Sequence, residues 1–114
     1  MIKIYGIPNC DTMKKARRWL DEHEIAYQFH NFKKDGLDRE LLLGWVETLG
    51  WEALLNRRGM MWRKLDEETK ANIDRESAIR VMLEIPSILK RPVLDTGNSL
   101  HVGFSVQDYQ KIFA

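Results

Sequence analysis

The first 32 residues contain the pattern that most restricts the fold: a short apolar strand, a turn, an amphipathic helix and a second strand. Residues 2–5 are an apolar run typical of a buried strand. Apolar residues at helical spacing follow over 12–23, and residues 25–32 alternate well enough for a second strand. A helix of this length between two strands is a βαβ unit. We therefore expect two parallel strands joined by a right-handed crossover.

The middle of the chain is predicted to be helical. Asp38, Asp66 and Asp74 each precede a helically spaced apolar segment, which is the typical place of a helix N-cap. Pro86 then ends the last of these segments, because proline cannot continue a helix. These signals predict a helical insert over about residues 37–85.

The C-terminal part predicts a ββα unit. Segments 92–95 and 99–103 flank a turn that contains Gly97, which indicates an antiparallel hairpin. Ser105 can then cap a last helix. The order of elements predicts a single α+β domain over 1–114, with a mixed four-stranded sheet and the helical insert between its two halves.

The only cysteine, Cys10, lies where the first strand turns into the first helix. A helix N-terminus offers unpaired N–H groups and the positive end of the backbone dipole, and both favour the reactive thiolate. Lys14, one turn later, adds a cation. The alternative is a small buried core residue, which is a common fate of a lone cysteine. The polar neighbours Asn9 and Asp11 favour the reactive thiol.

Composition gives few further constraints. The 114 residues carry a formal net charge of +1, so nothing indicates a nucleic-acid or membrane partner. One cysteine excludes an intramolecular disulfide, and no secretory signal pattern or long apolar run is present. We expect a cytoplasmic protein. His23, His30 and His101 are too scattered to predict a metal site.

Four segments in order resemble the arsenate-reductase-like family, which also contains the disulfide-stress regulators of Gram-positive bacteria. They are 9–16 (NCDTMKKA), 54–59 (LLNRRG), 62–65 (WRKL) and 90–93 (KRPV). In detail the chain resembles an uncharacterised branch of that family, which is proposed to contain glutathione-dependent thiol reductases. The resemblance covers nearly the whole chain and implies a thioredoxin-like fold.

The resemblance also implies a site. It makes Cys10 the nucleophile, Arg91 the anion-binding arginine beside it, and Pro92 a cis-proline. We expect the substrate or glutathione to bind near a set of neighbouring residues: Asn9, Asp11, Thr12, Lys14, Arg58 and Pro92. The regulators' arginine falls on Arg58, so we favour it over Arg57, and both remain candidates.

Some positions depart from the family patterns. The arsenate enzymes carry an arginine after the hairpin, where this chain has Gly103, and another directly after the two leucines, where it has Asn56. Their loop has a histidine near Gly6 and a serine near Met13. The regulators carry a second cysteine at the position of Met13. The sequence therefore predicts neither efficient arsenate reduction nor an internal disulfide switch.

Two functions remain open. The first is a monothiol oxidoreductase in which Cys10 attacks a disulfide, sulfenic acid or oxyanion, and glutathione or another small thiol resolves the intermediate. Glutathione would be a co-substrate and not a bound cofactor, with glutaredoxin or a protein disulfide as a partner, and we expect a monomer. The second is a non-enzymatic adaptor that binds a protein such as RNA polymerase, as the regulators do.

Overall fold

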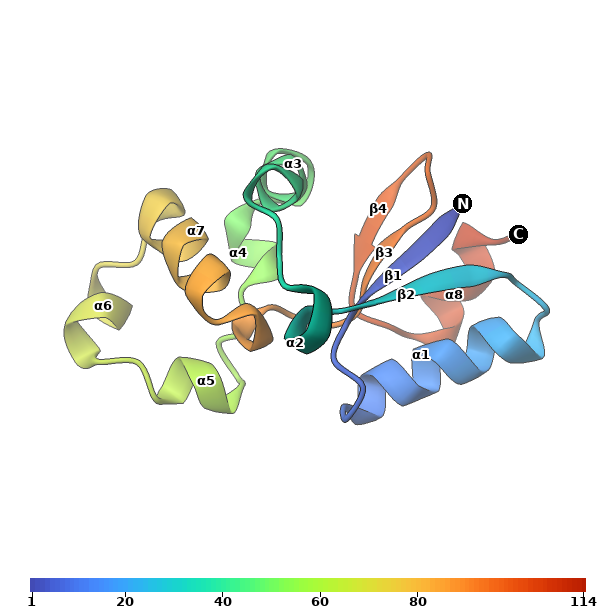
Figure 1. Ribbon diagram of the computed structural model, residues 1–114, viewed down its shortest axis with the longest axis horizontal. Helices are drawn as coiled ribbons and strands as arrows, with labels where there is room; N and C mark the ends of the chain where they lie inside the picture. The colour runs from blue at the N-terminus through green and yellow to red at the C-terminus, as the bar shows by residue number, and fades with distance from the viewer. The chain divides into compact units, whose positions relative to one another are not determined.

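The computed structural model describes residues 1–114, which form two compact units (Figure 1). The first unit comprises Met1–Asn31 and Arg91–Ala114, and the second is the continuous segment Phe32–Lys90. The second unit contains the predicted insert, and it begins earlier and ends later than the expected 37–85. None of the helices combines the length and apolar character needed to cross a membrane.

The first unit is built on a mixed sheet with strand order β2-β1-β3-β4. Strand β1 pairs in parallel with β2 and antiparallel with β3, and β3 pairs antiparallel with β4. This confirms the predicted α+β fold with a mixed four-stranded sheet. The elements of this unit are β1 (Ile2–Gly6), α1 (Asp11–Glu22), β2 (Tyr27–Asn31), β3 (Val93–Asp95), β4 (Leu100–Val102) and α8 (Val106–Ile112).

Element bounds differ from expectation mainly around β2. The strand begins only at Tyr27, because the chain after α1 first makes a turn. In that turn Glu24 has a φ of 56°, and the Ile25 N–H donates to the Leu20 carbonyl at 2.9 Å. Such bonds satisfy the last carbonyls of a helix. The residues that make them therefore belong to the turn, although the alternating pattern assigned them to the strand. At its other end β2 stops at Asn31, since Phe32 already begins a helix.

Helices α1 and α8 cover the same face of the sheet. Ile4 of β1 lies opposite Leu94 of β3, and both side chains are fully buried beneath these helices. The ring of Tyr109 packs edge-on against Trp19 and Phe104, at centroid distances of 5.5 and 4.6 Å. The helical members of this core cluster are Met13, Ala16, Trp19, Leu20 and Tyr109. The whole apolar stripe predicted for the first helix, which is Met13, Ala16, Trp19 and Leu20, is therefore in this core.

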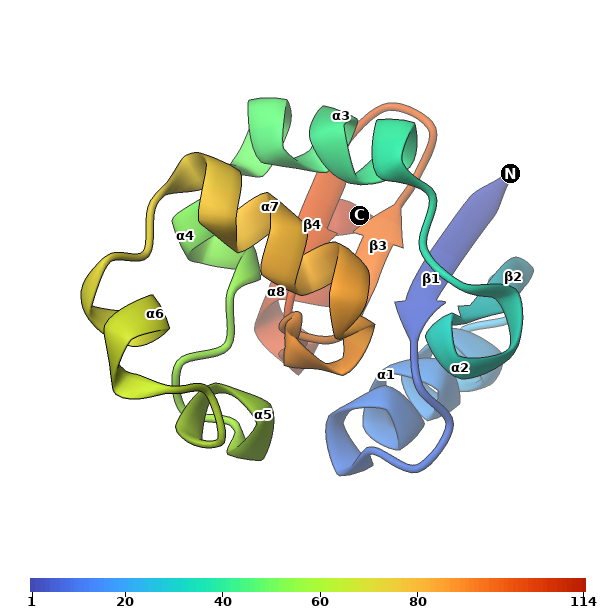
Figure 2. The same ribbon diagram turned by 60° about the vertical axis from the view of Figure 1, so that its left-hand side comes forward.

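The named elements of the second unit are all helical, and turns and irregular segments connect them (Figure 2). Its longest helices, α3 and α7, pack against each other, and their buried side chains include Leu42, Trp45, Ala78 and Met82. The elements of this unit are α2 (Phe32–Asp35), α3 (Arg39–Leu49), α4 (Trp51–Leu54), α5 (Met60–Arg63), α6 (Glu67–Ala71), α7 (Arg75–Glu84) and a 3₁₀ turn, η1 (Pro86–Ile88).

The predicted caps of the second unit are confirmed. The carboxylates of Asp38, Asp66 and Asp74 accept the backbone N–H groups of the third residue after each, at 3.1, 3.1 and 2.9 Å. The N–H of Asp74 also bonds to the Ser77 hydroxyl, which completes a reciprocal capping box. Ser105 caps α8 in the first unit in the same way. These four helix starts were readable from sequence because the cap is a local interaction.

Candidate functional site

Cys10 is the N-cap of α1. Its backbone is extended, with φ −137° and ψ 126°, while its carbonyl already accepts the Lys14 N–H at 3.0 Å and so closes the first turn of the helix. The thiol is free and half-buried. It makes no conventional capping hydrogen bond. The sulfur therefore lies at the mouth of the helix, where the first N–H groups have no partners inside the helix.

The surroundings of Cys10 act on its pKa in opposite directions. Partial burial is the largest single effect and raises the pKa of the thiol. The backbone N–H of Met13, the hydrogen bond and charge of the Arg91 side chain, and the backbone N–H of Thr12 all lower it. Together these favourable interactions prevail, so the pKa of Cys10 lies below its ordinary value. The sequence predicted that N–H groups at the start of this helix favour the thiolate, and the structure identifies them as those of Met13 and Thr12.

Arg91 reaches Cys10 through the pairing of β1 with β3. Tyr5 lies opposite Val93, and the strands are antiparallel, so the residues just before Val93 lie beside the end of β1 from which the Cys10 turn departs. Pro92 is buried, and the Arg91–Pro92 peptide bond is cis, as the resemblance implied. The Pro92 carbonyl accepts the Gly103 N–H at 2.9 Å, which ties this corner to the end of β4.

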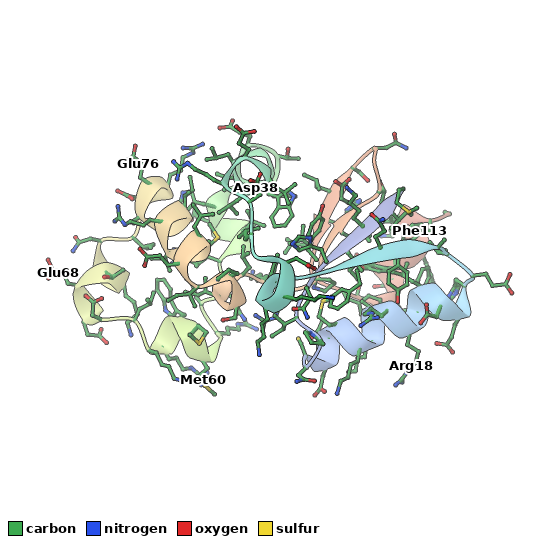
Figure 3. The ribbon with its side chains drawn as sticks, in the orientation of Figure 1. Arg18, Asp38, Met60, Glu68, Glu76 and Phe113 are labelled. Atoms are coloured by element: carbon green, nitrogen blue, oxygen red, sulfur yellow. The ribbon has the colours of Figure 1, made fainter.

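The other predicted residues of the first unit surround the turn. Asn9 and Asp11 are exposed on either side of Cys10, and Thr12 is half-buried. Lys14 is exposed, and the cation that acts on the Cys10 sulfur is Arg91. A contribution from Lys14, and contacts of these residues with a substrate, stay predictions. Arg18 also points outward from α1 (Figure 3).

Arg57 and Arg58 belong to the second unit and have different surroundings there. The Arg57 guanidinium lies 5.7 Å from the Trp51 ring centroid and 5.4 Å from that of Trp62, which are cation–π distances. Arg58 is exposed, and its backbone N–H bonds to the Asn56 side chain at 3.2 Å. Both arginines are exposed, and they differ in that the Arg57 guanidinium lies close to two aromatic rings. The choice of Arg58 over Arg57 as a ligand-binding residue stays a prediction.

Two positions that differ from the family patterns have clear conformations. Gly103 has a φ of 86°, a left-handed value that any other side chain would strain. Met13 is fully buried in the core beneath α1. The first position thus lacks the arginine of the arsenate enzymes, and the second carries a packing residue in place of a second thiol.

The histidines do not gather into a metal site. His23 stacks on Trp19 with ring centroids 3.8 Å apart, and its Nδ1 lies 2.8 Å from the Trp19 carbonyl oxygen. His101 Nε2 lies 2.8 Å from the Ser99 hydroxyl. No group of three or more histidine, cysteine, aspartate or glutamate side chains is arranged to hold a metal ion.

A mixed sheet with two helices on one face, and a free cysteine at the N-terminus of its first helix, defines a thioredoxin-like protein. The chain belongs to the ArsC family, whose model matches residues 5–112. An uncharacterised protein of Haemophilus influenzae is 41% identical over 114 residues, which covers both chains completely. A global transcriptional regulator Spx of Streptococcus agalactiae is 31% identical over 108 residues, covering 92% of this chain and 77% of the regulator.

Two solved structures agree with this assignment. The YFFB (PA3664) protein is 51% identical, with a TM-score of 0.96 and complete coverage of both chains. An arsenate reductase (ArsC) related protein from Brucella melitensis is 52% identical, with a TM-score of 0.81 and coverage of 98% of this chain and 93% of that one. These relatives support a function related to thiol oxidoreductases or to the Spx regulators.

Proposed function

We propose that the protein is a monothiol oxidoreductase that uses Cys10 as its nucleophile and glutathione as the external thiol. The observation that carries the proposal is the convergence of the Arg91 side chain and the Met13 and Thr12 N–H groups on a half-buried, free sulfur. A thiolate is the nucleophilic form of cysteine, and each of these groups favours it.

The reaction consists of two thiol–disulfide exchanges. The Cys10 thiolate attacks a mixed disulfide between a substrate and glutathione; a new S–S bond joins Cys10 to glutathione, and the substrate leaves as a thiolate. A second glutathione thiolate then attacks this bond. Cys10 leaves as a thiolate again, and glutathione disulfide is formed. The free glutathione is oxidised from thiol to disulfide while the substrate sulfur is reduced from disulfide to thiol, and Cys10 returns unchanged, so no second cysteine is needed in the protein.

Arg91 is proposed to act through charge. Its guanidinium stabilises the Cys10 thiolate before attack and again when the sulfur leaves in the second exchange. Asn9, Asp11, Thr12 and Pro92 are proposed to surround the approaching disulfide. Lys14 is proposed as a partner for a glutathione carboxylate, because it carries an exposed positive charge. Arg58, an exposed cation of the second unit, is proposed separately as a residue that binds an anionic group of the ligand.

The test is a coupled assay with purified protein, a glutathionylated peptide, glutathione and an NADPH-dependent glutathione reductase. We expect turnover that Cys10→Ser abolishes and Arg91→Ala reduces. Arg18→Ala is the matched control, since it removes an exposed arginine of the same unit and should leave turnover unchanged. Turnover by Cys10→Ser equal to that of the original chain would contradict the proposal.

The similarity to Spx favours a second candidate, a protein that binds a partner without turnover. The match to the Spx regulators extends over 92% of this chain. Co-purification with RNA polymerase, together with no activity in the coupled assay, would favour this function. A regulator of this kind would lack a disulfide switch within the turn, because Met13 stands where a second cysteine would be needed.

The setting of the enzyme follows from the same chemistry. A free thiol that depends on glutathione requires a reducing compartment, so we propose that the protein acts in the cytoplasm. We also propose that it is a monomer. Protein disulfides, or a glutaredoxin that shares the glutathione pool, are the proposed partners. Sedimentation of the purified chain tests the monomer.

A further inference from the structure

The turn that carries Cys10 begins at Gly6, and Gly6 lies directly against Met13. A Cβ atom placed on Gly6 would lie 2.9 Å from the Met13 Cε and 3.1 Å from its Cγ, and closer still to its Sδ. Real Cβ atoms essentially never approach a heavy atom closer than 3.0 Å. The thioether therefore occupies the space that any side chain at residue 6 would need.

Met13 has little freedom to move away. Its side chain is fully buried within the core cluster that also contains Ile4, Ala16 and Leu94, and Cys10 packs against the same cluster. Interiors are closely packed, so a displaced buried side chain must push its neighbours or shift the backbone. The nearest movable backbone is the turn between Gly6 and Cys10.

Met13 thus takes part in two structures at once. Its side chain packs against Gly6 at the start of the turn, and its backbone N–H points toward the Cys10 sulfur at the end of the turn. The three residues enclose the turn, with Gly6 at the end of β1, Cys10 as the N-cap of α1, and Met13 at the third position of α1.

We propose that Gly6 and Met13 are a positioning pair, in which the buried thioether packed against Gly6 holds the turn in the one conformation that faces the Cys10 sulfur toward the Met13 and Thr12 N–H groups. Neither residue touches the substrate, so both act through Cys10. The inference rests on the proposed function and deepens it, because it names what keeps the nucleophile in its reactive setting.

The test combines Gly6→Ala, Met13→Ala and the double variant, with Cys10 alkylation by iodoacetamide measured against pH. Gly6→Ala pushes the turn outward and Met13→Ala removes its support, so each single variant should slow alkylation at pH 6 by about three- to tenfold. In the double variant the new Cβ fits the space left by the thioether, so alkylation should be faster than in either single variant. Leu20→Val, which shortens another fully buried side chain of the same helix, should leave the pH profile unchanged.

The outcomes separate this inference from the proposed function. Two results would overturn the proposed positioning pair. One is an alkylation rate in the double variant that is lowered by the two single effects combined, and the other is an unaltered pH profile of alkylation in the single variants. If Gly6→Ala fails to fold, the profiles of Met13→Ala and the double variant still decide, because rescue requires the double variant to be faster. Failure of the coupled glutathione assay would instead reject the oxidoreductase and leave these titrations interpretable.

Discussion

The side chain of Arg91 hydrogen-bonds to the sulfur of Cys10, although the two residues come from opposite ends of the chain. The antiparallel pairing of β1 with β3 brings them together: Tyr5 lies opposite Val93, so the turn that follows β1 and the residues that precede β3 lie at the same end of the two strands. The electrostatics of the candidate site therefore depend on the sheet register. A one-residue slip of β3 would place the arginine on the other face of the sheet.

Cys10 should titrate below the pKa of about 8.5 that is ordinary for a free cysteine. The N–H groups of Met13 and Thr12 and the charge of Arg91 lower its pKa more than burial raises it. Because Cys10 is the only cysteine, the alkylation rate against pH reports this single thiol. A midpoint at or above the free value would contradict this arrangement of groups around the sulfur.

The same shift makes stability depend on pH. The pKa of Cys10 is lower in the folded protein than in the unfolded chain, so thiolate formation stabilises the fold. This contribution is fully present above the unfolded pKa and is lost as the pH falls through the folded pKa. The free energy of unfolding of the original chain, relative to Cys10→Ser, should therefore decrease as the pH falls from the unfolded pKa of about 8.5 through the lower folded pKa of Cys10. Urea titrations of both proteins at several pH values measure this difference in the free energy of unfolding. A difference that stays constant with pH would contradict the lowered pKa of Cys10.

Arg91→Ala should slow Cys10 alkylation at pH 6 by about five- to tenfold, because one charge at a partly exposed site changes ionisation by this order. Arg91→Lys should retain part of the rate, since it keeps the charge and loses the planar fork. Circular dichroism should show an intact fold in each variant. Arg18→Ala, an exposed arginine on α1, is the control, and an equal slowing in that variant would show that Arg91 has no special role.

Arsenate reductase activity should be weak or absent in a glutathione- and glutaredoxin-coupled assay. The arsenate enzymes place an arginine where this chain has Gly103, and the φ of 86° at Gly103 disfavours any side chain. Robust arsenate turnover by the purified protein would show that this arginine is dispensable.

Substitutions of Arg57 and Arg58 should have different effects, one on stability and the other on kinetics. Arg57→Ala removes a guanidinium that lies close to the rings of Trp51 and Trp62, so it should lower the free energy of unfolding by about 1 kcal/mol. Arg58→Ala should leave stability nearly unchanged, because only its backbone N–H holds the turn. In the coupled assay Arg58→Ala should instead raise the KM for glutathione. Urea unfolding and steady-state kinetics of the two variants measure both effects. A larger decrease in the free energy of unfolding for Arg58→Ala than for Arg57→Ala would show that Arg58 is the arginine that stabilises the fold.

Local signals were sufficient for much of the fold. The N-caps Asp38, Asp66, Asp74 and Ser105 were predicted correctly, because a cap depends on residues within one turn of it. The position of Cys10 at a helix start followed from the strand–turn–helix pattern for the same reason. The start of β2 was predicted too early, because the alternating pattern does not reveal the hydrogen bonds that end α1.

The sequence by itself determined the order of elements, the helix caps and the position of the single thiol, since each depends on neighbours in the chain. The resemblance added Arg91, Pro92 and the fold family. Only the tertiary structure decided which backbone groups act on the sulfur, that the Arg57 guanidinium lies close to the rings of Trp51 and Trp62, and that Met13 fills the space beside Gly6. These are contacts between side chains and backbone on different elements, and they are set by strand register and by close packing in the core.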